Sequence, residues 1–150
     1  MWMDERTLFA EAEALGGSTG RRLVGDVIDL GSLRDIGSTE NIFLVILVTT
    51  AAVSGGTTNV TFELVSDDSA TIAVDGSASV HWTSEAIPKA TLVVGYEVAK
   101  IMVPLEGSTP YERYLGIIAN VDTTAVSAGA ITAFLTSRPP NRRVYPNAVQ

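Results

Sequence analysis

The chain has 150 residues, of which 46% are hydrophobic and 18% are charged, and its formal net charge is -7. This length suits one domain with one core, and the composition lies well outside the range that predicts disorder. The negative charge argues against direct nucleic-acid binding, which requires clustered Lys and Arg. Because the chain has no cysteine, disulfides, thiolate metal sites and cysteine nucleophiles are excluded.

Residues 1–20 predict an N-terminal arm for which two conformations are open. The apolar residues of the segment 4–15 follow helical spacing, which favours a short amphipathic helix. The alternative is an extended arm that becomes ordered only against a neighbouring molecule. The glycine-rich residues 16–20 would end a helix, and they predict a flexible joint rather than a phosphate-binding loop, because no strand precedes them and no Gly-Lys-Ser/Thr follows.

Residues 21–137 have the pattern of an all-β sandwich of about eight strands. The strongest strand is the unbroken apolar run 42–50, and the second is the back half of residues 110–121. The other predicted strands are residues 24–30, 60–64, 71–74, 79–83, 90–94, 96–103 and 130–136. The start of the chain lacks a hydrophobic signal segment, and the longest apolar run is shorter than the ~20 residues that cross a bilayer. We therefore expect a soluble, non-secreted protein with no membrane partner.

The residues that could carry catalysis or bind a metal are few. His81 is the only histidine, it lies in a predicted strand beside Trp82, and no Gly-x-Ser-x-Gly motif accompanies it. Asp67 and Asp68 lack the spaced acids and the glycine of a calcium-binding loop, so a solvated acidic turn is favoured. The expectation is a protein without enzymatic activity, with no cofactor and no metal.

The segment 111–114 places two tyrosines around a glutamate and an arginine at the entrance of a strand. An Arg in such a position usually holds loop carbonyls or pairs with a carboxylate, so Arg113 is interpreted as a structural clamp. Tyr111, Glu112, Arg113 and Tyr114 together are candidates for organising the subunit or its oligomer. The scattered aromatic residues could stack on sugars, although core and interface roles are more common.

Three local signatures occur in a particular order. The first is Val27-Ile28-Asp29-Leu30-Gly31 followed by Arg34-Asp35-Ile36-Gly37, and the second is Gly95 followed by Val103-Pro104-Leu105. The third is Tyr111-Glu112-Arg113-Tyr114-Leu115-Gly116-Ile117 followed by Gly129-Ala130-Ile131-Thr132-Ala133-Phe134. Over about residues 24–136 the chain resembles the capsid cement, or decoration, proteins of tailed bacteriophages of the Bordetella short-tailed phage type.

This resemblance implies a jelly-roll-like β-sandwich that binds the outer surface of an expanded icosahedral shell and ties neighbouring capsomers together. The implied partners are the major capsid (coat) protein and other copies of the chain, as a dimer or trimer. The implied location is the outer surface of the virion, after synthesis in the host cytoplasm. The candidate coat contacts lie in the arm and in the acid-free tail 138–150, and they are Leu8, Phe9, Leu15, Arg142, Arg143 and Tyr145.

An alternative function is a small carbohydrate- or host-surface-binding module of a phage structural protein. This alternative predicts that exposed aromatic side chains line a groove. An enzyme is a distant third possibility, because any triad would depend on His81.

Overall fold

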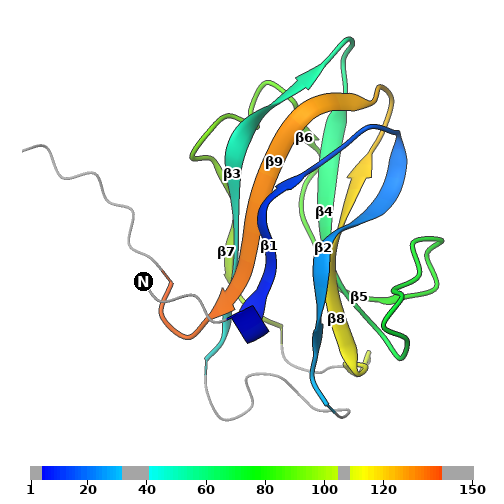
Figure 1. Ribbon diagram of the computed structural model, residues 1–150, viewed down its shortest axis with the longest axis vertical. Helices are drawn as coiled ribbons and strands as arrows, with labels where there is room; N and C mark the ends of the chain where they lie inside the picture. Colours follow the sequence, from blue (N-terminus) through cyan, green and yellow to red (C-terminus); the bar gives the residue numbers. More distant parts are fainter. Residues whose placement is uncertain (1–4, 32–40, 105–108, 140–150) are drawn as a thin grey trace, which may run out of the picture.

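The computed structural model describes residues 5–31, 41–104 and 109–139, which form two antiparallel sheets packed face to face (Figure 1). The first sheet has the order β1 (Leu8–Ala14), β9 (Val126–Thr136), β3 (Phe43–Ser54) and β7 (Glu97–Met102). The second has the order β2 (Gly20–Asp29), β8 (Tyr114–Val121), β4 (Asn59–Asp67) and β5 (Ser79–Thr83), and the short β6 (Ile87–Pro88) also pairs with β4. A single 3-10 turn, η1 (Glu5–Thr7), precedes β1 in the described part of the chain. The predicted all-β sandwich is confirmed.

The chain crosses from one sheet to the other at almost every connection. β1, β3, β7 and β9 belong to the first sheet, while β2, β4, β5 and β8 belong to the second. Two antiparallel sheets with these strand orders have the connectivity of a jelly roll. The jelly-roll fold implied by the resemblance is therefore present.

The core between the sheets is built from alternate residues of the central strands. Leu44 and Ile46 of β3 are fully buried there, as are Phe62 and Leu64 of β4 and Ile117 of β8. Burying a side chain of this size contributes about 1.5–3 kcal/mol to folding. The two sheets are thus joined mainly by hydrophobic packing.

Apolar side chains also lie on the outer faces of both sheets. On the second sheet, Val65 and Ile118 are covered by Ile72 and Ala78 from the β4–β5 connection. On the first sheet, Val45, Leu47 and Phe134 form a separate buried cluster against which Leu8 packs. These outer clusters explain why β3 and β8 read as unbroken apolar runs instead of alternating ones.

Of the two conformations left open for the N-terminal arm, the helix is wrong, because residues Leu8–Ala14 form the edge strand β1. Pairing with β9 at four positions of β1 and burial of its apolar side chains override the helical propensity of this segment. The register shifts between Leu8 and Ala10 and again between Ala10 and Glu13, and Ala12 has a φ of 50°. A strand interrupted in this way has no simple alternation of apolar and polar residues.

Two of the predicted strands are also absent. Residues 71–74 lie in the β4–β5 connection, where the apolar Ile72 packs on the outside of the second sheet rather than within a ladder. Residues 90–94 form turns after β6, in which the Leu92 amide donates to the Lys89 carbonyl oxygen at 3.1 Å. Each of these loops contains an apolar residue whose side chain is buried, Ile72 or Leu92, and the apolar residues of the loop resemble the pattern of a strand.

Candidate functional site

The segment that leads into β8 is held in place by its first aromatic residue. Tyr111 is 1% exposed, and its ring stacks on His81 with a centroid separation of 3.8 Å and an interplanar angle of 19°. The Tyr111 hydroxyl donates a hydrogen bond to the Pro104 carbonyl oxygen at 2.5 Å. These contacts tie the loop before β8 to β5 and to the end of β7, so Tyr111 has a structural role.

Ser66 joins the same segment to β4 and β5. Its hydroxyl is fully buried, accepts the Glu112 backbone N–H at 3.0 Å and lies 2.6 Å from His81 Nε2. The Ser66 hydroxyl and His81 Nε2 share one hydrogen bond, whose direction follows the tautomer of the imidazole. Burial lowers the pKa of His81, and the nearby Glu112 carboxylate opposes this shift. A neutral His81 fits this arrangement.

The Ser66–His81 pair has the atoms of a nucleophile and its base, but not their accessibility. A catalytic hydroxyl must reach the substrate, whereas the Ser66 side chain is 0% exposed. The pair therefore fixes the position of Glu112 and of β5. His81 therefore has a structural role in this arrangement.

Arg113 forms a two-pronged ion pair with Asp29 at the end of β2. Its Nε and one terminal nitrogen donate to the two carboxylate oxygens of Asp29, both at 2.9 Å. The same carboxylate accepts the Gly31 N–H at 2.8 Å, and Gly31 has a φ of 74°, a conformation that glycine adopts without strain. Arg113 therefore pairs with a carboxylate, one of the two kinds of partner expected from the sequence, and Asp29-Leu30-Gly31 is the turn that presents it.

The Arg113 guanidinium lowers the pKa of Asp29 and also contacts the aromatic ring of Tyr114. The hydrogen bond from Arg113 is the largest cause that lowers the pKa of Asp29 to about 2, and the Gly31 amide adds to it. The Arg113 guanidinium carbon lies 5.0 Å from the centre of the Tyr114 ring, within the range of a cation–π contact. Residues 111–114 thus each contact a different part of the second sheet or its loops.

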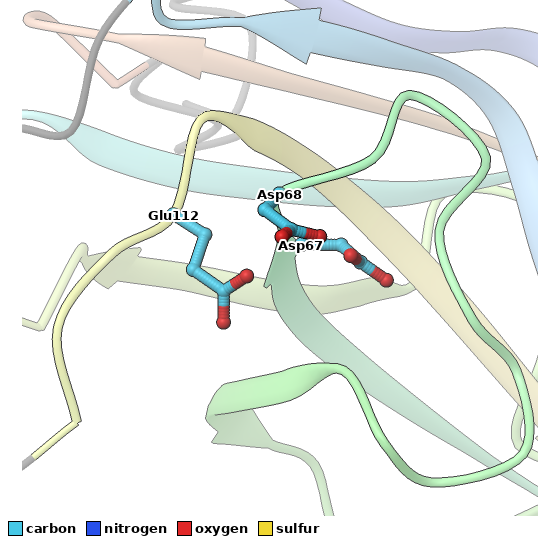
Figure 2. Close-up of side chains that lie close together, drawn as sticks. All are labelled: Asp67, Asp68 and Glu112. Atoms are coloured by element: carbon cyan, nitrogen blue, oxygen red, sulfur yellow. The ribbon is translucent and has the colours of Figure 1, made fainter.

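Three carboxylates, those of Asp67, Asp68 and Glu112, lie within 4.8 Å of one another (Figure 2). The two aspartates come from the end of β4, and Glu112 comes from the segment before β8. Asp67 accepts the amides of Ser69 at 3.1 Å and Ala73 at 2.9 Å, while Glu112 accepts the Ser79 hydroxyl at 2.6 Å. Two of the three carboxylates are therefore engaged in shaping the β4–β5 connection.

The two neighbouring aspartates have opposite pKa shifts. The Ala73 amide is the largest cause that lowers the pKa of Asp67, whereas the hydrogen bond and the charge of Asp67 raise the pKa of Asp68. Calcium takes about six to eight oxygen ligands. Three carboxylates with two of them committed to the loop supply only part of such a set.

Asp122 is a second polar clamp, and the sequence analysis missed it. It follows β8 and accepts hydrogen bonds from the Thr58 hydroxyl at 2.9 Å and from the backbone and side-chain nitrogens of Asn59, both at 2.8 Å. The Asn59 amide is the largest cause that lowers the pKa of Asp122. The only signal in the sequence is an Asp directly after a strand and before two threonines, a common turn pattern.

The structure changes the assignment of the predicted coat contacts in the arm. Phe9 is 1% exposed and Leu15 is 0% exposed, because both side chains enter the core of the sandwich. In this conformation they attach β1 to its own domain and cannot contact a partner. Leu8 is partly buried against the outer cluster of the first sheet, and Arg142, Arg143 and Tyr145 lie outside the described residues.

Three exposed valines lie in the end of β3 and in the segment beside it. The Ala52 amide donates to the Leu92 carbonyl oxygen and the Gly95 amide donates to that of Val48, both at 2.9 Å, so residues 92–95 run beside β3. Val53 is 53% exposed, Val93 52% and Val94 68%. These three valines are called the valine patch below.

A shallow hollow contains the aromatic side chains that a sugar-binding site would need. Its volume is about 280 Å³, and Trp82 and Tyr96 are among the residues that line it. Ser84 and Glu85 supply polar groups at the same place. Both rings also pack against the core cluster, so their contribution to folding accounts for their position without a ligand.

The fold and these contacts define a jelly-roll protein whose best-placed polar side chains hold loops together. The sequence model of the Bbp16 family matches residues 9–135, and the chain belongs to this family of Bordetella phage proteins. A search of the curated proteins finds no match. Among the described residues, no helix has the length and apolar character to span a membrane.

Proposed function

We propose that the chain is a capsid cement protein, which binds the outside of the expanded phage shell and stabilises the contacts between neighbouring capsomers. The observation that carries this proposal is the family match over residues 9–135, which includes nearly the whole jelly roll. The polar clamps support it, because they use the best candidate catalytic groups to hold loops. The proposed partners are the coat protein and other copies of the chain.

The valine patch is the surface that we assign to the coat protein. Exposed apolar side chains can provide protein–protein contacts, and here the exposed fractions of all three valines exceed one half. Burying them against a coat subunit would remove apolar surface from water at about 25 cal/mol per Å². Each subunit contributes a modest patch, and many symmetric copies on a shell add to the total stabilisation. Leu8 and the tail residues Arg142, Arg143 and Tyr145 remain further candidate contacts.

The proposed mechanism is a shift of the shell toward its expanded state. The cement recognises a composite surface that two or more coat subunits form only after expansion. A ligand that binds one state and not the other stabilises the bound state by mass action. No covalent chemistry or cofactor is required.

The valine patch can be tested by its effect on binding to purified expanded shells. The double substitution Val93→Ser and Val94→Ser should weaken co-sedimentation on the order of tenfold, because it places polar groups at the centre of an apolar contact. The matched control is Val74→Ser with Val80→Ser, which changes two exposed valines in β5 and the connection before it, 40% and 39% exposed. Equal binding by both variants would remove the valine patch from the account.

A second candidate function is sugar binding in the hollow that contains Trp82 and Tyr96. Aromatic faces beside polar groups are what this function needs, and the volume of about 280 Å³ would hold a small sugar unit. It predicts hits on a glycan array that the substitution Trp82→Ala abolishes. A blank array would leave the cement function as the only proposal.

A further inference from the structure

His81 lies in a β-bulge, where β5 has one residue more than the opposing part of β4. The pairing register shifts between Trp82 and Val80, so His81 has no partner in β4. A bulge changes the direction of the side chain of its extra residue. Here the imidazole stacks on the ring of Tyr111, with the two centroids 3.8 Å apart. The bulge therefore joins β5 to the segment before β8.

That segment, residues 109–113, lies outside the strands and is held by three consecutive residues. Tyr111 stacks on the bulged imidazole, and the Glu112 amide donates to Ser66 Oγ at 3.0 Å. Arg113 is held separately, by its ion pair with the end of β2. Two of the three attachments therefore depend on the imidazole or on the serine bonded to it, and the third depends on neither.

The proton of the Ser66 hydroxyl can find an acceptor only at His81. Ser66 Oγ has two hydrogen-bond partners among the described residues, namely the Glu112 amide, which donates to it, and His81 Nε2 at 2.6 Å. When Nε2 carries no proton, the hydroxyl donates to it and both groups are satisfied. When Nε2 carries a proton, the hydroxyl accepts twice, and its own proton is left without an acceptor in a residue that is 0% exposed.

A protonated imidazole permits only the second arrangement, because it carries a proton on both nitrogens. Burial also opposes the charged ring and lowers the pKa of His81, while the Glu112 carboxylate acts in the other direction. Asp67 and Asp68 at the end of β4 lie beside Glu112 (Figure 2), and the ring itself touches the uncharged phenol of Tyr111. Proton uptake therefore breaks a satisfied hydrogen bond in a place that disfavours the charge.

We propose that His81 is a pH switch for residues 109–113. In its neutral form His81 holds this segment against β4 and β5. Proton uptake releases Tyr111 and Glu112, while the ion pair of Arg113 remains. The inference concerns the free protein and does not depend on the proposed capsid function.

Amide hydrogen exchange, followed for single residues by NMR, tests the release. The released segment binds the proton more tightly than the held one, so release becomes more favourable as the pH falls below about 6.5, by at most about tenfold per pH unit for one proton. The protection factor of the Glu112 amide should therefore fall by about threefold or more between pH 7 and pH 5. The control is the Leu30 amide, which donates to the Arg113 carbonyl oxygen at 2.9 Å and should keep its protection. Equal changes at both amides, or no change at Glu112, would overturn the proposal.

The substitution His81→Gln identifies the group that takes up the proton. Glutamine does not titrate, and its side-chain oxygen can still accept a hydrogen bond from the Ser66 hydroxyl. The fall in Glu112 protection should be absent from this variant. Asp68→Asn is the matched control for the neighbouring carboxylates and should retain the fall. A pH dependence that survives His81→Gln would assign the proton to another group, and the proposed switch would be wrong.

Titration of the imidazole in the parent protein is a second test, which holds even if a variant fails to fold. The chain has a single histidine, so the ring nitrogens give one set of NMR signals. The pKa of His81 should lie below its ordinary value of about 6.5, and the neutral ring should carry its proton on Nδ1. Ser66→Ala removes the donor to the neutral ring and should raise this pKa. A neutral ring protonated on Nε2, or a pKa that Ser66→Ala leaves unchanged, would contradict the proposal.

Discussion

The two sides of β2 differ in how the chain holds them. On the β8 side, backbone hydrogen bonds join β2 to β8, and at the end of β2 Arg113 forms a bidentate ion pair with Asp29. On the β1 side the strands approach most closely at Gly25, but no ladder joins these two described strands and an acidic groove lies between them. Hydrogen bonds and an ion pair hold β2 to β8, whereas side-chain packing around Gly25 holds β2 to β1.

This difference separates the parts of the molecule that fold it from the parts that are available for binding. Tyr111, Glu112 and Arg113, with Ser66, His81 and Asp29, use their polar groups within the chain. The groove and the valine patch leave charges and apolar surface without a partner among the described residues. We expect substitutions on the β8 side to change stability, and substitutions on the open surfaces to change binding.

The largest effect is expected at Tyr111. Replacing this buried ring with alanine leaves a cavity and removes the stack on His81, so Tyr111→Ala should lower the free energy of unfolding by about 3–5 kcal/mol. Tyr111→Phe keeps the ring and loses the hydrogen bond to Pro104, for a loss of about 1 kcal/mol. Urea unfolding of both variants checks this. Equal losses would show that the stack contributes little.

A smaller loss is expected at the glycine that joins the two edge strands. Gly25→Ala places a Cβ atom against the Phe9 carbonyl oxygen at a φ of 73°, and should cost more than about 1 kcal/mol. Gly17→Ala is the matched control, because its φ is also positive, at 128°, but no atom lies within 4 Å of the new Cβ. The difference between the two variants isolates the approach of β1 to β2. Identical unfolding curves would mean that the close approach is not required.

The smallest effect is expected from the exposed ion pair and should depend on pH. The pKa of Asp29 is lowered to about 2 in the folded chain. The contribution of this carboxylate to stability is therefore complete above the pKa that Asp29 has in the unfolded chain, near 4. It is lost as the pH falls from about 4 to about 2. Asp29→Asn should therefore be less stable than the parent at pH 7 and lose less stability over this interval.

Urea unfolding at a series of pH values measures this dependence. Arg113→Met should reduce it as well, and the double variant should behave like either single one, since both remove the same pair. If the stabilities of the parent and of the Asp29→Asn variant fell in parallel below pH 4, the assignment would be contradicted.

The β-sandwich and the structural role of Arg113 could be predicted from the sequence. The long apolar runs of β3 and β8 indicated central strands, and an Arg at a strand entrance indicated either loop carbonyls or a carboxylate as its partner. The partner itself, Asp29, could not be chosen, because it lies 84 residues away and only the pairing of β2 with β8 brings it close. The same applies to Ser66, which looked like any loop serine and is fully buried.

The edge strand β1 was missed for a local reason. The spacing of Leu8, Phe9 and Leu15 fits a helix, and the intervening Ala and Glu residues favour one. The irregular register of β1 against β9 hides the two-residue period that would identify a strand. The groove beside β1 could therefore not be predicted from the sequence, because it depends on where β1 lies.

The most direct test of the proposed function is co-sedimentation of the purified chain with coat shells, comparing expanded shells and unexpanded precursors at the same coat concentration. The account predicts saturable binding to expanded shells and none to precursors, because the composite surface exists only after expansion. Equal binding to both would contradict a maturation-dependent site, and no binding to either would contradict the cement function for that coat protein.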